Sequence, residues 1–207
     1  MLASGSPSFQ FRLTCIASGV LAATIAVVVA PPALAQEDRI RPVTDAELEN
    51  PSPDDWLMWR RTLDGWGYSP LDQINRENVG DLRMVWSRGL RPGRQQGTPL
   101  VRDGMMFMPN PRDIIQAIDA ETGDLIWEHR RDRPDDLGDY MIGTLTDTNR
   151  NIAIHGELII DTSMDDHIFA LHAETGEVVW DTEILDYRVN PANQTSGPIV
   201  AGGKGFS

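Results

Sequence analysis

The sequence contains a single cysteine, Cys15, which lies ahead of a long apolar run rather than after it. A lipid-bearing signal cysteine would follow that run, so Cys15 is not expected to carry a lipid. If the N-terminal segment is removed, the remaining chain has no thiol. Disulfides, thiolate metal sites and a cysteine nucleophile are then excluded.

The sequence also lacks an apolar run long enough to span a membrane. Its longest uncharged apolar stretch, residues 16–30, has fifteen residues, whereas spanning requires ~20. Ala33 and Ala35 follow it and provide the small side chains at which a signal peptidase cleaves. We expect residues 1–35 to be a signal peptide cleaved after Ala35, which places the chain in the periplasm with no stable membrane anchor. The alternative is an uncleaved anchor.

Positive charge is scarce. The formal net charge is −13, and removal of Arg12 with the signal makes it −14. No cluster of Lys and Arg outweighs the neighbouring acids, so a nucleic-acid partner is excluded. The acidity fits a soluble exported surface, or else attraction to a basic protein. The 172 residues after the signal suffice for one ordinary domain with a core of its own.

An internal repeat gives the strongest indication of architecture. Residues 117–127 (AIDAETGDLIW) and 170–180 (ALHAETGEVVW) align without a gap, and their tryptophans are 53 positions apart. Each copy has an apolar run, a turn and a second run ending in Trp, so Gly123 and Gly176 are expected at positive φ. We interpret Trp86, Trp127 and Trp180 as packing anchors of successive blades, with stacking on a ligand as the alternative.

Further hairpins are predicted at 98–110, at 152–163 with His155-Gly156 as the turn, and at 197–206. Helices are expected only near 44–50 and 71–82. The fold class is therefore all-β, and repeats of this size indicate a β-propeller.

The motif A-x-D-A-x-T-G-x-x-x-W resembles the tryptophan-docking motif of quinoprotein dehydrogenases, with His172 replacing the usual Asp in the second copy. We read His172 as blade variation rather than as a metal ligand. Residues 54–86 resemble the N-terminal signature of alcohol dehydrogenases that use pyrroloquinoline quinone (PQQ). The matching positions are Trp56, Tyr68, Ser69, Pro70, Leu71, Ile74, Asn75, Asn78, Val79, Leu82 and Trp86.

The resemblance implies an eight-bladed propeller, of which this chain would contain a part of about three to four blades. Residues 36–86 would form a leader segment with the first propeller strands, and residues 87–207 would form the blades. The resemblance also implies that an exported dehydrogenase oxidises an alcohol or sugar with PQQ and Ca²⁺ and passes electrons to cytochrome c or a quinone. The alternative is a non-catalytic envelope propeller that binds other proteins.

Five residues match cofactor-binding positions of the family. Gln96 stands where many relatives have a glutamate that hydrogen-bonds PQQ, although a polar residue at a strand end is the alternative. Arg150 matches an arginine beside the quinone, although a surface ion pair is the alternative. Thr144 and Leu145 occupy the places of two adjacent cysteines, and Thr195 matches a threonine bonded to the cofactor.

The calcium ligands and the catalytic base of the family would lie beyond residue 207, so no metal-binding or catalytic residue is expected within this chain. We expect a truncated gene, a frameshift near Lys204 or an incomplete sequence, and a chain that is inactive alone. An open stack of blades also leaves one sheet face and one edge uncovered.

Overall fold

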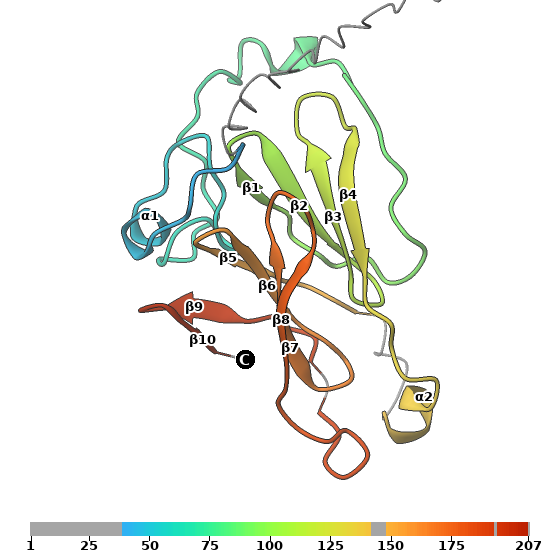
Figure 1. Ribbon diagram of the computed structural model, residues 1–207. Coiled ribbons are helices and arrows are strands. Elements are labelled where there is room, and N and C mark those ends of the chain that lie inside the picture. The colour runs from blue at the N-terminus through green and yellow to red at the C-terminus, as the bar shows by residue number, and fades with distance from the viewer. Residues whose placement is uncertain (1–38, 142–147, 193, 207) are drawn as a thin grey trace, which may run out of the picture. The chain divides into compact units, whose positions relative to one another are not determined.

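Each copy of the tryptophan repeat ends a four-stranded antiparallel sheet in the computed structural model, which describes residues 39–141, 148–192 and 194–206. The first sheet contains β1 (Leu100–Arg102), β2 (Met105–Asn110), β3 (Ile114–Asp119) and β4 (Leu125–Arg130). The second contains β5 (Ala153–His155), β6 (Leu158–Thr162), β7 (His167–His172) and β8 (Val178–Glu183). A hairpin of β9 (Ile199–Ala201) and β10 (Lys204–Phe206) follows. Both sheets are meanders in sequence order (Figure 1).

The turns of the repeat have the predicted backbone. Gly123 and Gly176 have φ of 78° and 73°, and Gly156 in the β5–β6 turn has φ of 58°. Residues with a Cβ rarely adopt such angles, so these glycines fix the places where the chain reverses. The predicted hairpins form, and the all-β, propeller-like fold class is confirmed.

His172 takes over part of the role of the aspartate in the first copy. Asp119 Oδ1 accepts hydrogen bonds from the backbone N–H groups of Glu121 and Thr122. In the second copy His172 Nδ1 accepts from the N–H of Glu174 at 3.3 Å. The imidazole therefore supports the turn, which agrees with its interpretation as blade variation.

Tryptophans of the repeat dock onto the turn of the following sheet. Trp127 Nε1 donates to the carbonyl of Ala173 at 2.9 Å, and a Cβ on Gly176 would lie 2.6 Å from the indole ring. Trp86 donates in the same way to Ala120 at 3.1 Å and lies against Gly123. These two tryptophans are packing anchors, as predicted, and each one links two successive units of the chain.

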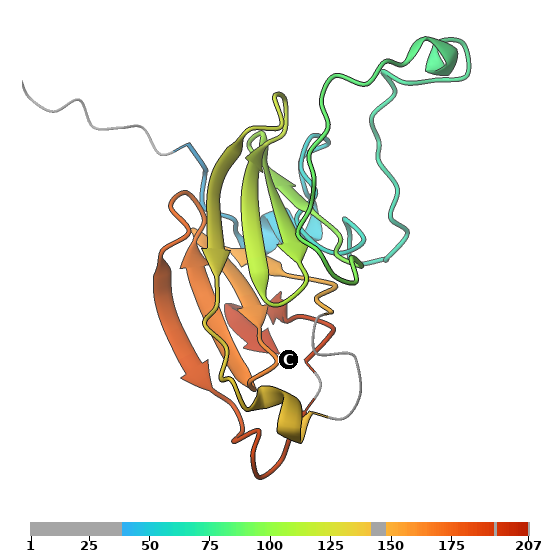
Figure 2. The same ribbon diagram turned by 90° about the vertical axis from the view of Figure 1, so that its right-hand side faces the viewer.

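The main core fills the space between the two sheets, which lie side by side in Figure 2. Phe107, Ile115 and Trp127 of the first sheet meet Ile159 and Phe169 of the second in one cluster of buried residues. A smaller cluster on the other face of the second sheet packs against Val200 of β9. The hairpin β9–β10 therefore continues the stacking direction of the first two sheets.

The leader segment is attached to the first and second sheets. Thr44 and Glu47 form a capping box at the start of α1 (Asp45–Glu49), which confirms the helix predicted near 44–50. Val43 pairs with Gly156, and Trp56 pairs with Val101 of β1. These contacts join the leader to β1 of the first sheet and to the β5–β6 turn of the second.

One buried guanidinium reinforces this attachment. Arg102 is almost fully buried and makes ion pairs of 2.7 Å with both Asp55 and Glu47 of the leader. Removal of Arg102 would leave the buried carboxylate of Asp55 without its cation, which is the costly way to break such a pair.

Three expectations for local structure were wrong. The described residues 39–99 contain single bridges but no named strand, so the first propeller strands predicted within 36–86 do not form in its described part, residues 39–86. A strand needs a partner strand for its backbone N–H and C=O groups, and the described residues offer none to this segment. Met84 and Val85, which lie in it, are largely exposed.

The helix predicted over 71–82 is reduced to the 3₁₀ turn η1 (Val79–Asp81), at the tip of the loop that extends from the sheets in Figure 2. The reason is that Asn75 and Asn78 bond nearby backbone N–H groups instead. The short helix α2 (Leu137–Tyr140) was not predicted. None of the helices in the described residues is long and apolar enough to cross a bilayer.

Candidate functional site

Three of the predicted site residues occupy equivalent places in successive units. Gln96, Arg150 and Thr195 each lie three or four residues before the first strand of a sheet or hairpin, namely β1, β5 and β9. Since these first strands are neighbours along the stack, the segments that lead into them converge at one end of the sheets.

The structure brings these three residues into contact. Arg150 Nε donates to Gln96 Oε1 at 2.8 Å, and Arg150 Nη1 donates to the carbonyl of Thr195 at 3.3 Å. The Arg150 carbonyl accepts from the N–H of Thr98 at 3.0 Å. Thr144 and Leu145, also predicted for this site, lie outside the described residues.

The chemistry of this arrangement is that of an anion or polarised oxygen site. Arg150 is half-buried and Gln96 is exposed, so a planar guanidinium and an amide stand together at the surface of the described segment. Guanidinium N–H groups match carboxylates in a fixed fork geometry and stabilise negative charge on an oxygen. Gln96 accepts one N–H of Arg150 and thereby limits the rotation of the guanidinium.

Close backbone packing holds the segments before β5 and β9 together. A Cβ on Gly197, whose φ is 65°, would lie 1.9 Å from the carbonyl oxygen of Asn151. Asn151 Nδ2 also donates to the carbonyl of Ser196 at 2.7 Å. Only glycine allows this approach, and the sequence pattern gave no sign that Gly197 serves the site rather than a turn.

A buried polar pair lies next to Arg150 along the chain. Asn149 Nδ2 donates to Asp161 Oδ2 at 2.6 Å, and the N–H of Thr162 donates to Asp161 Oδ1 at 2.8 Å. Asp161 is fully buried in β6. Burial raises its pKa well above the usual value, and the carboxylate of Asp113 raises it further. Sequence reasoning did not identify Asp161.

Asp113, in the turn between β2 and β3, is a second buried acid. Burial raises its pKa to about 6, against an opposing effect of Arg133, whose guanidinium lies 3.9 Å away. Other charges nearby are paired, since Arg131 bonds both Asp165 and Asp181.

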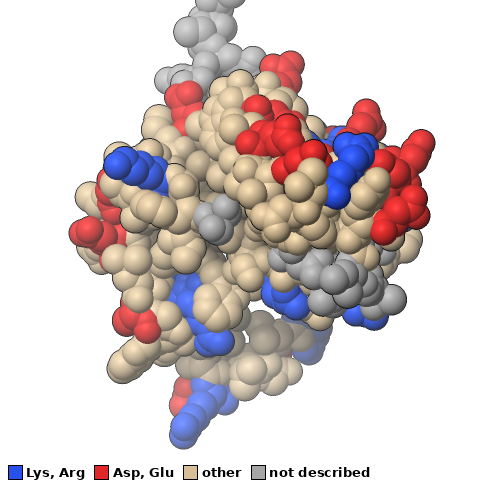
Figure 3. All heavy atoms as spheres, turned by 90° about the horizontal axis from the view of Figure 1, so that it is seen from below, with Lys and Arg blue, Asp and Glu red and all other residues tan. Residues whose placement is uncertain are grey.

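On the face shown in Figure 3, basic side chains are interspersed among acidic and uncharged residues rather than merged into one patch.

Asp113→Asn is expected to raise the free energy of unfolding at pH 8 by about 1–3 kcal/mol. Between about pH 4 and 6 the folded chain holds a proton on Asp113 that the unfolded chain has lost, so its contribution to stability falls as the pH rises through this window. Asparagine tolerates the φ of 55° at this position and carries no charge. Urea unfolding from pH 4 to 8 should give a flatter profile for the variant.

Asp103 provides a matched control, since it is also an aspartate at positive φ in a β-turn, with φ of 48°. Partial burial raises its pKa, but hydrogen bonds from Arg41 outweigh this and hold the pKa below its usual value. Asp103→Asn should therefore lower stability at pH 8. A loss of stability in Asp113→Asn at pH 8 would mean that the contact with Arg133 outweighs the cost of burial.

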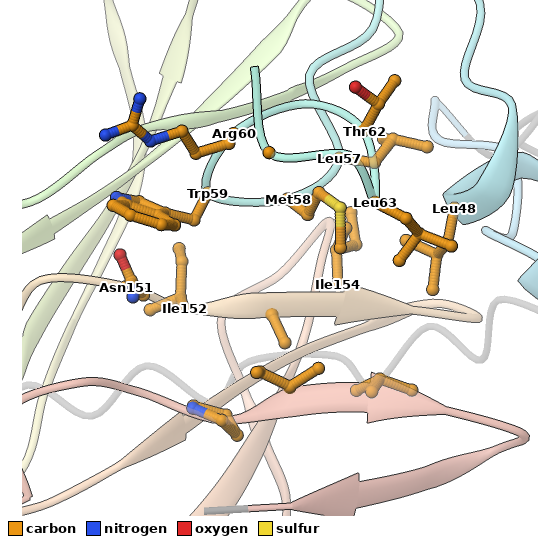
Figure 4. A pocket seen from close by; sticks show the side chains of 15 residues that line it. Leu48, Leu57, Met58, Trp59, Arg60, Thr62, Leu63, Asn151, Ile152 and Ile154 are labelled. Atoms are coloured by element: carbon orange, nitrogen blue, oxygen red, sulfur yellow. The ribbon is translucent and has the colours of Figure 1, made fainter. Parts of the chain in front are cut away.

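An apolar pocket of about 320 Å³ adjoins the site on the side of Asn151. The leader loop forms one wall, and β5 and β9 form the other. In Figure 4 the ring of Trp59 lies over Asn151 and Ile152, with Leu57, Met58 and Leu63 farther along the same wall. The leader thus lies over β5 and β9, directly beside the segment that carries Arg150.

The geometry agrees with comparisons against known proteins. Residues 56–178 match the model of the PQQ-binding β-propeller domain of glucose, ethanol and alcohol dehydrogenases. The dehydrogenase subunit of alcohol dehydrogenase (quinone) from Gluconobacter oxydans is 33% identical over 198 residues, which are 93% of this chain and 25% of that protein. The 1-butanol dehydrogenase (cytochrome c) of Thauera butanivorans is 33% identical over 141 residues, or 68% of this chain and 20% of that protein.

A solved quinohemoprotein alcohol dehydrogenase from Pseudomonas putida superposes with a TM-score of 0.67 at 29% identity, covering 81% of this chain and 25% of that structure. The chain spans about a quarter of the length of the curated relatives it matches. The matched domain covers more than half of the chain and contains Gln96 and Arg150. The chain therefore belongs to the PQQ β-propeller family of quinoprotein alcohol dehydrogenases.

Proposed function

We propose that this chain supplies one sector of the PQQ pocket in an exported quinoprotein that oxidises an alcohol or a sugar. The observation that carries the proposal is the contact of Arg150 with both Gln96 and Thr195, because it joins residues from three successive units at one end of the sheets. Those three positions are among the five that the family resemblance assigns to the cofactor.

The donor set fits PQQ. The cofactor is a planar anion with three carboxylates, and a half-buried guanidinium beside an amide offers planar N–H donors to such a group. We propose that Gln96, Arg150 and Thr195 hold one side of it, with Thr144 and Leu145 contributing from outside the described residues. When bound, PQQ supplies a quinone that accepts two electrons from the substrate.

The residues of this chain have two roles in that proposal. Arg150 provides fixed positive charge where negative charge develops on an oxygen, which is effective because the protein has already oriented it. Gln96 and the Thr195 carbonyl keep the guanidinium in place between them. Gly197 and Asn151 maintain the spacing of the segments that carry these groups.

Calcium is a different case. Among the described residues there is no group of three or more His, Cys, Asp or Glu side chains that could hold a metal ion. The described part of the chain therefore does not fit a Ca²⁺ ion, and we derive no step through the metal. Ligands for it would have to come from outside the described residues.

Substrate and acceptor follow from the relatives. The names of the relatives given above specify alcohols as substrates and a quinone or cytochrome c as acceptor. We propose a small alcohol, with a sugar as the alternative substrate, and one of these two acceptors for the protein that contains this segment.

A chimeric enzyme tests the proposed function. Residues 39–206 would replace the matching quarter of the Gluconobacter oxydans subunit, and dye-linked alcohol oxidation would be measured with PQQ and Ca²⁺. We expect turnover by the chimera and none by the 207-residue chain alone, which offers one sector of the pocket. A chimera that folds and binds PQQ but does not oxidise alcohol would favour the non-catalytic scaffold.

Export is the second part of the proposal and is tested separately. The apolar run at 16–30 and the Ala33-Leu34-Ala35 site support cleavage after Ala35 and a periplasmic location. Mass spectrometry of the chain from a periplasmic extract should give Gln36 as the first residue. Recovery of the chain with an intact N-terminus from the membrane fraction would instead support an uncleaved anchor.

A further inference from the structure

We propose that Asp161 is a positioning residue that orients Arg150 through Asn149. The inference rests on the proposed function, since it gives Asp161 a purpose only if Arg150 serves the cofactor pocket. Asp161 itself is fully buried and belongs to β6 rather than to the segments that converge at the site.

The segment 149–151 is held at three points. Asn149 is bonded to Asp161 inside the second sheet, the Arg150 carbonyl is bonded to Thr98 before β1, and Asn151 is bonded to Ser196 before β9. The last two bonds reach neighbouring units of the stack. The bond to Asp161 is the contact that fixes the segment to the strands of its own sheet.

Burial of the Asp161 carboxylate lowers the stability of the fold, so this residue is expected to have a role that compensates for the cost. An ionised carboxylate in the interior loses its hydration, and here it receives two N–H donors, from Asn149 and Thr162. Of the charges that act on it, Asp113 raises its pKa further and Arg131 lowers it, but Arg131 is already bonded to Asp165 and Asp181. An apolar residue of similar size would remove this cost of burying a charge, but it would leave the Asn149 amide and the Thr162 N–H without an acceptor.

The bond to Asn149 explains what the carboxylate does. Asn149 is buried and immediately precedes Arg150, so its side chain determines the path of the backbone from which the guanidinium extends. Asp161 Oδ2 accepts a hydrogen bond from this amide at 2.6 Å. Loss of the acceptor would release Asn149 and let the Arg150 backbone shift relative to Gln96.

The test follows the Arg150 side chain directly and needs neither cofactor nor turnover. Hydrogen exchange of the Arg150 Nε–H, which is bonded to Gln96, would be measured by NMR in the ¹⁵N-labelled full chain. Asp161→Leu should speed this exchange by about tenfold, the order expected for one lost hydrogen bond. Asp161→Asn retains an amide oxygen for Asn149 and should restore slow exchange.

The Trp127 Nε1–H serves as the internal control, because it is bonded to Ala173 within the main core. Positioning predicts that Asp161→Leu leaves the exchange of this Trp127 N–H unchanged, although Arg150 loosens. Parallel acceleration at Trp127 and Arg150 would show that Asp161 only supports the fold. Unchanged exchange at Arg150 would also overturn the proposal.

Asn149→Ala removes the same bond from the other side and covers the case in which Asp161→Leu does not fold. It should also accelerate exchange at Arg150 Nε–H by about tenfold. These outcomes are independent of the chimera assay. A silent Arg150→Ala in that assay would remove the functional role of Arg150 without altering the exchange result.

Discussion

Replacing Arg150 by alanine in the chimeric dehydrogenase is expected to lower the turnover number by at least about 100-fold, by analogy with the loss of one donor to a developing oxyanion. The guanidinium is held by Gln96 Oε1 and the Thr195 carbonyl. Dye-linked oxidation of a primary alcohol at saturating PQQ would measure the effect.

The matched control is Arg41→Ala. Arg41 is an exposed arginine whose carboxylate partner, Asp103, lies in the β1–β2 turn, at the opposite end of the first sheet from Gln96. Its replacement should leave turnover within about twofold, since exposed ion pairs contribute little. Equal turnover in the two variants would remove Arg150 from the cofactor site and favour the scaffold function.

The second large effect is on folding. Trp127→Ala should lower the free energy of unfolding by about 3–5 kcal/mol, the usual cost of removing a buried aromatic side chain. The indole is 9% exposed, contacts Phe107 with ring centroids 6.0 Å apart and donates to Ala173. Urea unfolding followed by circular dichroism would measure the loss without relying on tryptophan fluorescence.

Trp66→Ala controls for the removal of an indole as such. Trp66 is 79% exposed in the leader loop, so its replacement should change stability by less than about 0.5 kcal/mol. Trp180→Ala should cost less than Trp127→Ala, because Trp180 is half-buried and no third copy of the turn motif follows it in the sequence. A loss under about 1 kcal/mol at Trp127 would contradict the docking role.

Features that depend on a few neighbouring residues were predictable from the sequence. The turns at Gly123, Gly156 and Gly176 need positive φ whatever surrounds them, and the capping box at Thr44 acts within one helical turn. The leader loop was not predictable in this way. Its backbone would need a partner strand to form strands itself. Hydrogen bonds from backbone N–H groups to the side chains of Asn75 and Asn78 take the place of a helix.

The site was predictable only through the family resemblance. Nothing in the local pattern around Gln96, Arg150 or Thr195 indicates that they meet, since Gln96 and Arg150 are 54 residues apart in sequence and touch only after the sheets stack. Asp161 was missed because one acid in an apolar strand is usually assigned to the solvent face. Its contact with Asn149 becomes evident only when the folded segment before β5 is seen.

The docking of Trp127 on Gly176 has a consequence for how such chains can be recombined. A side chain at position 176 would displace the indole of Trp127. Trp127 and Gly176 are therefore compatible only as a pair, although they belong to different sheets. A crossover placed between β4 and β5 separates a tryptophan from its own glycine. Exchange of whole sheets between relatives should therefore succeed only if each donor turn is compatible with the tryptophan that precedes it. A unit that keeps the pair together runs from the last strand of one sheet, β4, to the turn between β7 and β8 of the next.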